Sequence, residues 1–238
     1  MRNQRSYSFG AAMYAWPFLV GVARYIQDND LLHEQARLYA ISAGSMPAVL
    51  LACGVDVERG LAAGLICNDT HRAGAPYLQP AIVRRSLDTF TAVLPPDAHV
   101  RASGRLFIAG TELPWFRKRV LSHFPTRGAL LDALAGTMAI PGHGVWVAYR
   151  PRESNVGWCL DGGVSGPLNE DDRQGWQTVR VGVGASPSGL FSRPRYADLF
   201  PSRPVPLRLR FTVAPTEHRM GLYRGGYQDA AQYFRSAA

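Results

Sequence analysis

One serine of this sequence lies where a predicted strand meets a predicted helix, in the segment Ala40-Ile41-Ser42-Ala43-Gly44. Residues 37–41 have the apolar character of a strand, and residues 45–53 have that of a helix. Ala40 and Gly44 are small enough for strand and helix to approach closely, and a tight turn between them lifts the hydroxyl out of the sheet. The amino end of the helix offers N–H groups to a developing oxyanion. This arrangement predicts Ser42 as a nucleophile; a serine that only caps the helix is the alternative.

A carboxylate that could activate this serine lies far along the sequence, at the end of another predicted strand. Asp161 follows the short apolar stretch 157–160 and is followed by Gly162 and Gly163. An aspartate in this place can project its side chain toward the top of the sheet and accept the hydroxyl proton as a general base. A plain turn is the alternative, because Asp-Gly-Gly is also favourable turn chemistry. The two motifs in this order are more informative than either one alone.

The elements that must position these residues alternate between strand and helix. Apolar residues at i, i+3, i+4 and i+7 predict a helix that starts near Leu19 and ends near Asn29, after a short strand at 6–9. Pro47 falls in the first turn of the next helix, where its missing N–H costs little, and Gly54 stands where a C-cap is expected. Strand, helix, strand and helix in this order predict a parallel sheet with flanking helices.

The rest of the chain continues this pattern. Further strands are predicted at 103–110, 157–160 and 178–183, and further helices at 128–138 and 227–235. Residues 184–215 are rich in Pro, Arg and Ser and are predicted to be loop. The expected fold class is α/β, a three-layer α/β/α sandwich with a central, mostly parallel sheet. The length and the apolar content of 47% predict a single domain over residues 1–238.

The apolar run 11–23 is too short to span a bilayer and contains Pro17 and Gly21. Because it follows Arg2 and Arg5, a secretory signal peptide is an alternative interpretation. We favour a structural role, since the predicted fold needs this segment as its first loop and helix.

The three cysteines are odd in number and have no Cys-x-x-Cys spacing, so they predict neither a disulfide framework nor a zinc site. Reduced, buried thiols fit best. They predict an intracellular compartment.

The net charge of +8 comes almost entirely from arginine, with Lys118 as the single lysine. A basic surface favours anionic partners, either nucleic acid or an anionic lipid surface. No nucleic-acid-binding module can be identified in the sequence, so nucleic acid is not expected. We therefore expect peripheral contact with an anionic lipid surface, through the arginines and through exposed aromatic residues near Trp115-Phe116 and Leu199-Phe200.

The two motifs, in this order, resemble those of the patatin-like phospholipase family, and specifically its adipose triglyceride lipase and adiponutrin branch. Segment 40–48 is similar to that family's G-x-S-A-G-A-L-x-A, and segment 161–165 is similar to its D-G-G-I-S. Further segments match in the same order, at 94–99, 102–106, 122–124, 140–142 and 226–230. The resemblance therefore extends over nearly the whole chain.

This resemblance implies a catalytic dyad of Ser42 and Asp161 in place of a triad. In that mechanism Ser42 attacks an ester carbonyl, Asp161 takes the proton, and water then hydrolyses the acyl-enzyme. The implied substrates are lipid esters, either acylglycerols or phospholipids, and the implied location is intracellular, either cytoplasmic or peripheral on a membrane or lipid droplet. Neither a metal nor a cofactor is implied.

The chain departs from the family in its oxyanion loop. The family has a glycine-rich loop, G-x-G-x-x-G, after the first strand, and here the three glycine positions hold Ala11, Met13 and Trp16. The candidate oxyanion loop is thus Gly10-Ala11-Ala12-Met13. Left-handed backbone at Ala or Met costs roughly 1 kcal/mol or more, so a loop that relaxes would displace a donor and slow turnover. The alternative path leaves Gly10 and the N–H of Ala43 as a complete oxyanion hole.

These departures leave a second function open, namely a catalytically weakened patatin-like domain that binds lipid or a protein partner. An α/β-hydrolase triad is a further alternative, since His218 is the one histidine after Asp161. Its segment is polar, however, and we expect His218 to be a surface residue. His143 is expected in a loop that borders the pocket, and Gly166-Pro167 stands where the family usually has Asp-Asn.

Overall fold

The computed structural model describes residues 4–69, 88–89, 91–140, 149–153, 157, 159–165, 170–183 and 197–236. Its strands are β1 Gln4–Phe9, β2 Leu38–Ile41, β3 Leu106–Glu112, β4 Arg117–Leu121, β5 Cys159–Leu160 and β6 Trp176–Val181. Its α-helices are α1 Trp16–Asp28, α2 Ser45–Cys53, α3 Val57–Asp69, α5 Ala98–Ala102, α6 Arg127–Thr137, α7 Leu207–Phe211 and α8 Thr216–Ser236. Short 3₁₀ helices follow β1, β2 and β5, at η1 Met13–Ala15, η2 Ser42–Gly44 and η3 Gly162–Val164.

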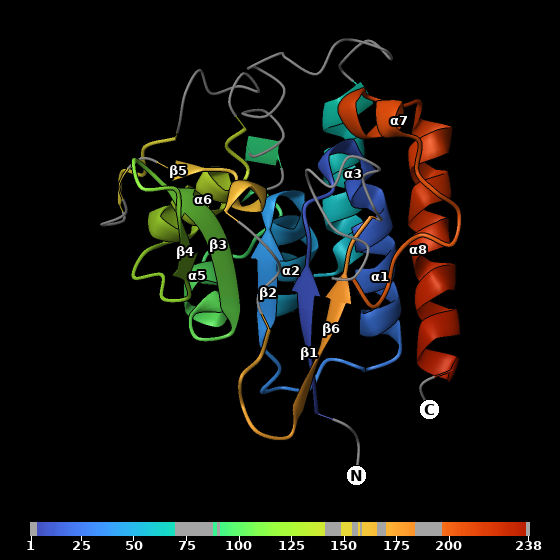
Figure 1. Ribbon diagram of the computed structural model, residues 1–238, viewed down its shortest axis with the longest axis horizontal. Helices are drawn as coiled ribbons and strands as arrows, with labels where there is room; N and C mark the ends of the chain where they lie inside the picture. Colours follow the sequence, from blue (N-terminus) through green and yellow to red (C-terminus); the bar gives the residue numbers. More distant parts are fainter. Residues whose placement is uncertain are drawn as a thin grey trace.

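The sheet has the order β4-β3-β2-β1-β6, in which β1, β2, β3 and β6 are parallel (Figure 1). β4 returns antiparallel to β3 at the edge, and β5 pairs antiparallel with the end of β3. The expected α/β class, a mostly parallel sheet flanked by helices, is confirmed. Parallel pairing brings the carboxyl ends of β1, β2 and β3 to one edge of the sheet, the upper edge in Figure 1.

The hydrophobic core lies against one face of this sheet. Tyr7 and Phe9 of β1, Leu38 of β2, and Leu106 and Ile108 of β3 occupy alternate positions and are buried in one cluster. Helices α1, α2, α6 and α8 contribute apolar side chains to the same cluster. The apolar run 11–23 forms the loop, η1 and the start of α1, which is the structural role predicted from the sequence.

Helix α8 packs along α1 through two close backbone contacts. A Cβ on Gly21 would clash with the carbonyl group of Tyr223, and a Cβ on Gly226 would clash with that of Phe18. The predicted start of the last helix at residue 227 is wrong, because α8 begins at Thr216. Glycine lowers helix propensity by about 1 kcal/mol, which obscures the first half of α8 in the sequence. In the fold, the same residue type lets the two helices touch.

Several other boundaries differ from the predictions. The strands predicted at 103–110 and 178–183 lie at 106–112 and 176–181. Helix α7 lies inside the stretch 184–215, which the composition predicts as loop, and residues 184–196 of that stretch are outside the described residues. Strand β4, with the sequence RKRVL, was not predicted, because three adjacent basic residues hide its strand character. Gly54 caps α2 in the left-handed conformation, as predicted.

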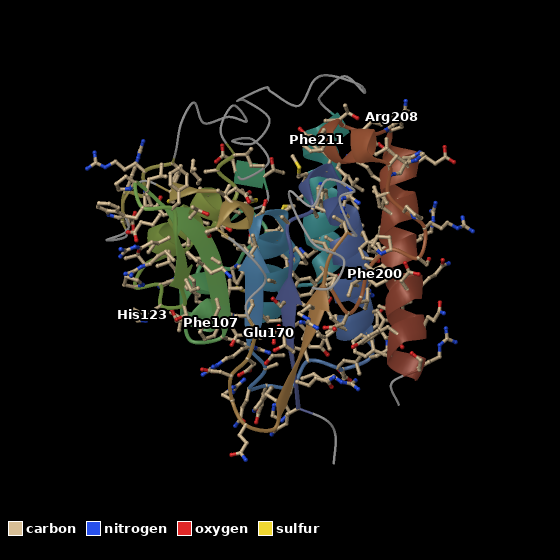
Figure 2. The ribbon with its side chains drawn as sticks, viewed as in Figure 1. Phe107, His123, Glu170, Phe200, Arg208 and Phe211 are labelled. Carbon is tan, nitrogen blue, oxygen red and sulfur yellow. The ribbon has the colours of Figure 1, made fainter. Side chains whose placement is uncertain are left out.

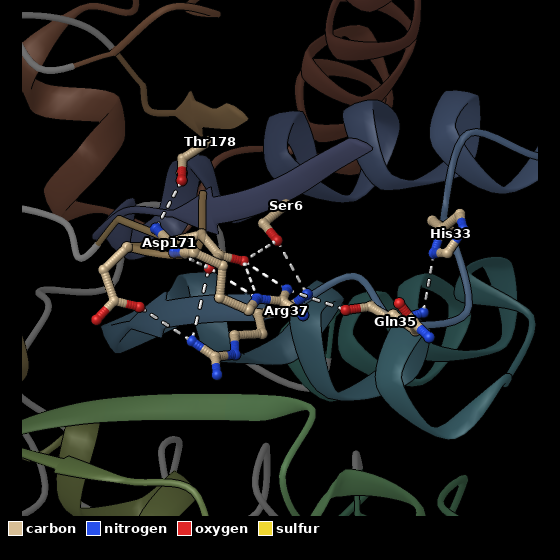
Figure 3. Close-up of polar contacts among 8 residues, drawn as sticks. Ser6, His33, Gln35, Arg37, Asp171 and Thr178 are labelled. Atoms are coloured by element: carbon tan, nitrogen blue, oxygen red, sulfur yellow. Dashed lines mark hydrogen bonds and ion pairs between the residues drawn. The ribbon is translucent and has the colours of Figure 1, made fainter. Parts of the chain in front are cut away.

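A polar network joins β1, β2 and β6 at the edge of the sheet opposite Ser42 (Figure 3). The Ser6 hydroxyl donates to Asp171 at 2.6 Å, and the Arg37 N–H donates to Ser6 Oγ at 3.0 Å. Arg173 forms an ion pair with Asp171 at 2.6 Å. Burial opposes ionisation, but hydrogen bonds from Arg173 and Ser6 lower the pKa of Asp171 to about 2. The ionised Asp171 therefore fixes the segment that enters β6.

Candidate active site

Ser42 occupies a sharp turn between β2 and α2. Its φ is 54°, in the left-handed region that residues other than glycine rarely adopt. The residue is only 3% exposed and begins η2. Strain of this kind is of order 1–3 kcal/mol and persists only where surrounding contacts impose it. The backbone geometry matches the strained strand-to-helix turn that a nucleophile elbow requires.

Two glycines of the motifs lie where separate backbone segments touch. A Cβ on Gly44 would clash with the carbonyl oxygens of Phe9 and Gly10, so glycine is what lets the turn pack against the end of β1. A Cβ on Gly162 would clash with the carbonyl oxygen of Ala109 on β3. Both glycines are therefore required by packing at this edge of the sheet, whatever chemistry takes place there.

The length of β3 determines where Ser42 lies. β2 runs parallel to β3, and its last residue, Ile41, is opposite Ala109. The chain then leaves the sheet at Ser42, while β3 continues for three more residues to Glu112. Ser42 therefore reaches the level of Gly110 on β3, beside an edge that β2 no longer covers.

β5 fills that uncovered edge of β3 from the opposite direction. It runs antiparallel, and Leu160 is opposite Thr111. β4 occupies the other edge of β3 at the same positions, so β5 must lie on the side of β2. The residue after Leu160 is Asp161, which also reaches the level of Gly110. Ser42 and Asp161 thus meet at one point of the sheet, from two strands that end there.

Asp161 is buried, and its main chain is held on both sides. Its N–H donates to the carbonyl of Ala139 at 2.7 Å, and its carbonyl accepts from the Thr111 hydroxyl at 2.8 Å. Its Oδ1 accepts from the N–H of Gly163 at 2.8 Å. Burial raises the pKa of Asp161 to about 6, although hydrogen bonding from Ser42 and Gly163 acts in the opposite direction.

The second carboxylate oxygen, Oδ2 of Asp161, is the atom available to the serine. It is buried, and no group within the described residues completes a hydrogen bond to it at normal distance and angle. Ser42 favours the ionised form of this carboxylate, which indicates that its hydroxyl lies near the Asp161 side chain.

Thr137, at the end of α6, holds the turn from behind. The N–H of Ser42 donates to Thr137 Oγ1 at 2.8 Å, and the Thr137 hydroxyl donates to the carbonyl of Ala109 at 2.5 Å. The Ser45 hydroxyl donates to the carbonyl of Ser42 at 2.7 Å. Thr137 was not predicted from the sequence, because a threonine at the end of a helix rich in Ala and Leu carries no signal of its own.

The candidate oxyanion loop lies beside the Asp motif. A Cβ on Gly163 would be 3.5 Å from the Cβ of Ala11. The N–H of Gly10 donates to the carbonyl of Val181 at 2.9 Å, so it continues the pairing of β1 with β6 and is not free for an oxyanion. Met13 has a φ of 52°, in the left-handed region. The loop therefore keeps this conformation in spite of the Met13 side chain and does not relax at this position.

Helix α7 packs against the end of this loop. It contacts η1, and the labelled residues Arg208 and Phe211 show that it lies at the upper edge of the sheet (Figure 2). Packing of α7 on η1 provides contacts that can hold Met13 in its strained conformation.

The remaining histidine and motif predictions fall outside this cluster. His218 is exposed on the first turn of α8, as predicted for a surface residue. His143 and Gly166-Pro167 lie outside the described residues. In the described part of the chain, no group of three or more His, Cys, Asp or Glu side chains is placed to hold a metal ion.

The described thiols, Cys53 and Cys159, are buried and free. Burial raises the pKa of each thiol to about 11, so both are neutral at neutral pH and are poor nucleophiles. Ser42 is therefore a better candidate nucleophile than either cysteine.

The raised pKa of the buried Asp161 should make the stability of the fold depend on pH. The folded-state pKa of Asp161, about 6, lies above the ordinary value of 3.8, so the folded protein binds more protons than the unfolded chain between these values. Ionised Asp161 therefore destabilises the fold above pH 6, and acidification toward pH 4 relieves this. We expect Asp161→Asn to raise the free energy of unfolding at pH 8 by roughly 1–3 kcal/mol, measured by urea titration.

Asp132 offers a matched control. It is also buried, but it accepts hydrogen bonds from the Tyr149 hydroxyl and from the N–H groups of Arg152 and Glu153. Asp132→Asn should lower the free energy of unfolding by about 1–3 kcal/mol, because an amide nitrogen cannot accept those bonds. A loss of stability at pH 8 in both variants would contradict the assigned environment of Asp161.

Comparison with known proteins places this geometry in context. No family model matches the chain. Over 68% of its length the chain is 30% identical to human "Patatin-like phospholipase domain-containing protein 5" and 27% identical to rat "Patatin-like phospholipase domain-containing protein 2". These matches cover 38% and 34% of the two relatives, so the chain spans about a third of their length.

A solved structure shares the fold. VipD from Legionella pneumophila superposes with a TM-score of 0.54 over 99% of this chain and 67% of its own, at 11% sequence identity. This likeness shows the fold alone, and the sequence matches show the homology. The chain is a homologue of the patatin-like phospholipase domain-containing proteins, with the adipose triglyceride lipase and adiponutrin branch among its relatives.

Proposed function

We propose that this chain is a serine acyl hydrolase that cleaves lipid esters through a dyad of Ser42 and Asp161. The observation that carries the proposal is the meeting of a left-handed, strained Ser42 with a buried carboxylate whose pKa is about 6. A nucleophile needs an adjacent base, and a base works best when its pKa lies near the working pH. Perturbed carboxylates of this kind are concentrated at functional sites.

In the proposed reaction, Asp161 Oδ2 accepts the proton of Ser42 as Oγ attacks the ester carbonyl. A tetrahedral intermediate forms and collapses as protonated Asp161 donates its proton to the departing alcohol, which leaves an acyl group on Ser42. Water enters, Asp161 takes one of its protons, and the hydroxide attacks the acyl carbon. The second tetrahedral intermediate collapses as Asp161 returns this proton to Ser42 Oγ, which releases the fatty acid and restores the serine hydroxyl. The cycle needs no redox partner.

The oxyanion of this reaction requires N–H donors. The N–H of Ala43 lies in the first turn of η2, where a helix leaves its donors without an intrahelical acceptor. Gly10 is excluded by its bond to Val181. We therefore assign the second donor to Ala11 or Ala12, in the loop between Gly10 and Met13. This assignment makes the conformation of Met13 important for turnover.

The proposed substrates are lipid esters, acylglycerols or phospholipids. Both relatives are named as phospholipase domain-containing proteins, and this supports a lipid substrate for the present chain. In the described part of the chain, no helix is long and apolar enough to cross a membrane. We propose that the chain reaches its substrate through peripheral contact with an anionic lipid surface.

The dyad can be tested with a water-soluble short-chain ester. We expect Ser42→Ala and Asp161→Asn each to lower kcat at least about 10³-fold, because each removes one member of a unit that acts together. His218→Ala is the control and should keep most of the activity. Urea titration of each variant separates lost chemistry from lost folding. Substantial activity in Ser42→Ala, or its disappearance in His218→Ala, would rule out the dyad.

The oxyanion loop can be tested at Met13. Met13→Gly should change kcat by less than about threefold, because the left-handed conformation is already present. Met13→Val should lower kcat about 10²-fold with little change in KM, since a β-branched residue resists positive φ and a displaced donor costs about 10²–10³ in rate. A large rise of kcat in Met13→Gly would instead favour the weakened-domain alternative, in which the native loop is not competent.

A further inference from the structure

The turn between β3 and β4 exposes two large aromatic side chains. Trp115 is 70% exposed and Phe116 is 60% exposed. The sequence predicted exposed aromatic residues here and at Phe200, which is also exposed. Exposed aromatics of this size are uncommon on a protein surface unless they take part in binding.

The fold itself gives no reason for these residues. Phe116 has a φ of 50°, a conformation for which turns favour glycine or asparagine. A bulky aromatic residue there carries backbone strain and also leaves its ring in water. β4 is an edge strand, and basic residues on such a strand prevent unwanted strand pairing. Protection of the sheet edge explains the arginines of β4. It does not explain the apolar residues of the turn, because exposed apolar side chains favour association.

Positive charge lies directly beside the aromatic tip. Arg117 and Arg119 are exposed on β4, and neither forms an ion pair with the described residues. The guanidinium of Arg117 lies 5.9 Å from the centroid of the Trp115 ring. Each basic residue close to an anionic membrane contributes on the order of 1 kcal/mol to binding. Aromatic rings flanked by arginine suit the boundary between lipid headgroups and acyl chains.

The tip also lies at the edge of the sheet that carries Ser42. Gly110 is level with Ser42, and two further residues of β3 rise about 7 Å along the strand before the turn begins. Trp115 and Phe116 therefore project roughly 10 Å beyond the level of Ser42, in the same direction. A surface that took up the tip would face this edge of the sheet.

We propose that the β3–β4 turn, residues 113–117, is a docking element that inserts Trp115 and Phe116 into an anionic lipid surface. The inference rests on the proposed function, since it gives the lipid surface as the source of the substrate. Shallow insertion of the two rings, with Arg117 and Arg119 at the headgroups, holds the Ser42 edge of the sheet against the lipid. The element thus orients the protein as well as attaching it.

The test measures sedimentation with phosphatidylcholine vesicles, with and without phosphatidylserine. The variant Trp115→Ser/Phe116→Ser should lower binding to anionic vesicles about tenfold, because it removes the inserted apolar surface. Arg117→Gln/Arg119→Gln should lower binding several-fold on anionic vesicles and leave neutral vesicles unaffected. Val100→Ser is the matched control: Val100 is 65% exposed on α5, just before β3, at the opposite edge of the sheet.

Hydrolysis provides the second readout. The Trp115→Ser/Phe116→Ser variant should retain wild-type kcat on a soluble ester but lose about tenfold in rate on vesicle lipid. If the Trp115→Ser/Phe116→Ser variant bound vesicles as well as the wild type and Val100→Ser do, the proposed docking element would be overturned. A tip variant that only alters self-association in sedimentation velocity would also overturn it, since the tip would then be a contact between copies. Tip-dependent vesicle binding by a wild-type chain that hydrolyses no ester would support docking and reject the proposed function.

Discussion

The candidate site depends on one feature of the sheet: β3 pairs with two different strands, β2 and β5, along the same edge. β2 covers the lower part of that edge and stops at Ile41, and β5 covers the upper part and stops at Leu160. Neither strand carries the site alone. Because they approach the same position from opposite directions, the residues that follow them, Ser42 and Asp161, are brought together beside Gly110. A shift of either strand by one residue would separate the two side chains and turn one of them to the other face.

The same junction concentrates features that oppose stability. Ser42 and Met13 have left-handed backbone, and Asp161 is a carboxylate buried well enough to raise its pKa to about 6. Such features persist only where the surroundings are rigid. Here the rigidity comes from the close packing of Gly44 against the end of β1 and of Gly162 against β3. The Thr137 hydroxyl adds hydrogen bonds to Ser42, after β2, and to Ala109 on β3. At the far edge, the Asp171 network fixes the other ends of the strands.

The sequence was sufficient for the main features of the fold and for the two motifs, because these depend on local patterns. Strand-to-helix succession, the small residues around Ser42, and Gly54 as a C-cap are all local signals. The features that could not be predicted from the sequence depend on contacts between distant segments. Thr137 acts only because α6 packs behind the turn, and the N–H of Gly10 is occupied only because β6 lies beside β1. The predicted start of α8 was wrong because Gly221, Gly225 and Gly226 weaken the helix signal, although Gly226 is needed for the contact with α1.

The central claim is that Asp161 activates Ser42, and covalent labelling measures it most directly. A fluorophosphonate reacts with an activated serine hydroxyl, and peptide mapping identifies the residue that carries the label. We expect the label on Ser42, with a labelling rate that is constant at neutral pH and falls as the pH drops through about 6, because the base works only when ionised. Labelling elsewhere, or a rate on Ser42 that is the same at pH 4.5 as at pH 7.5, would contradict the account.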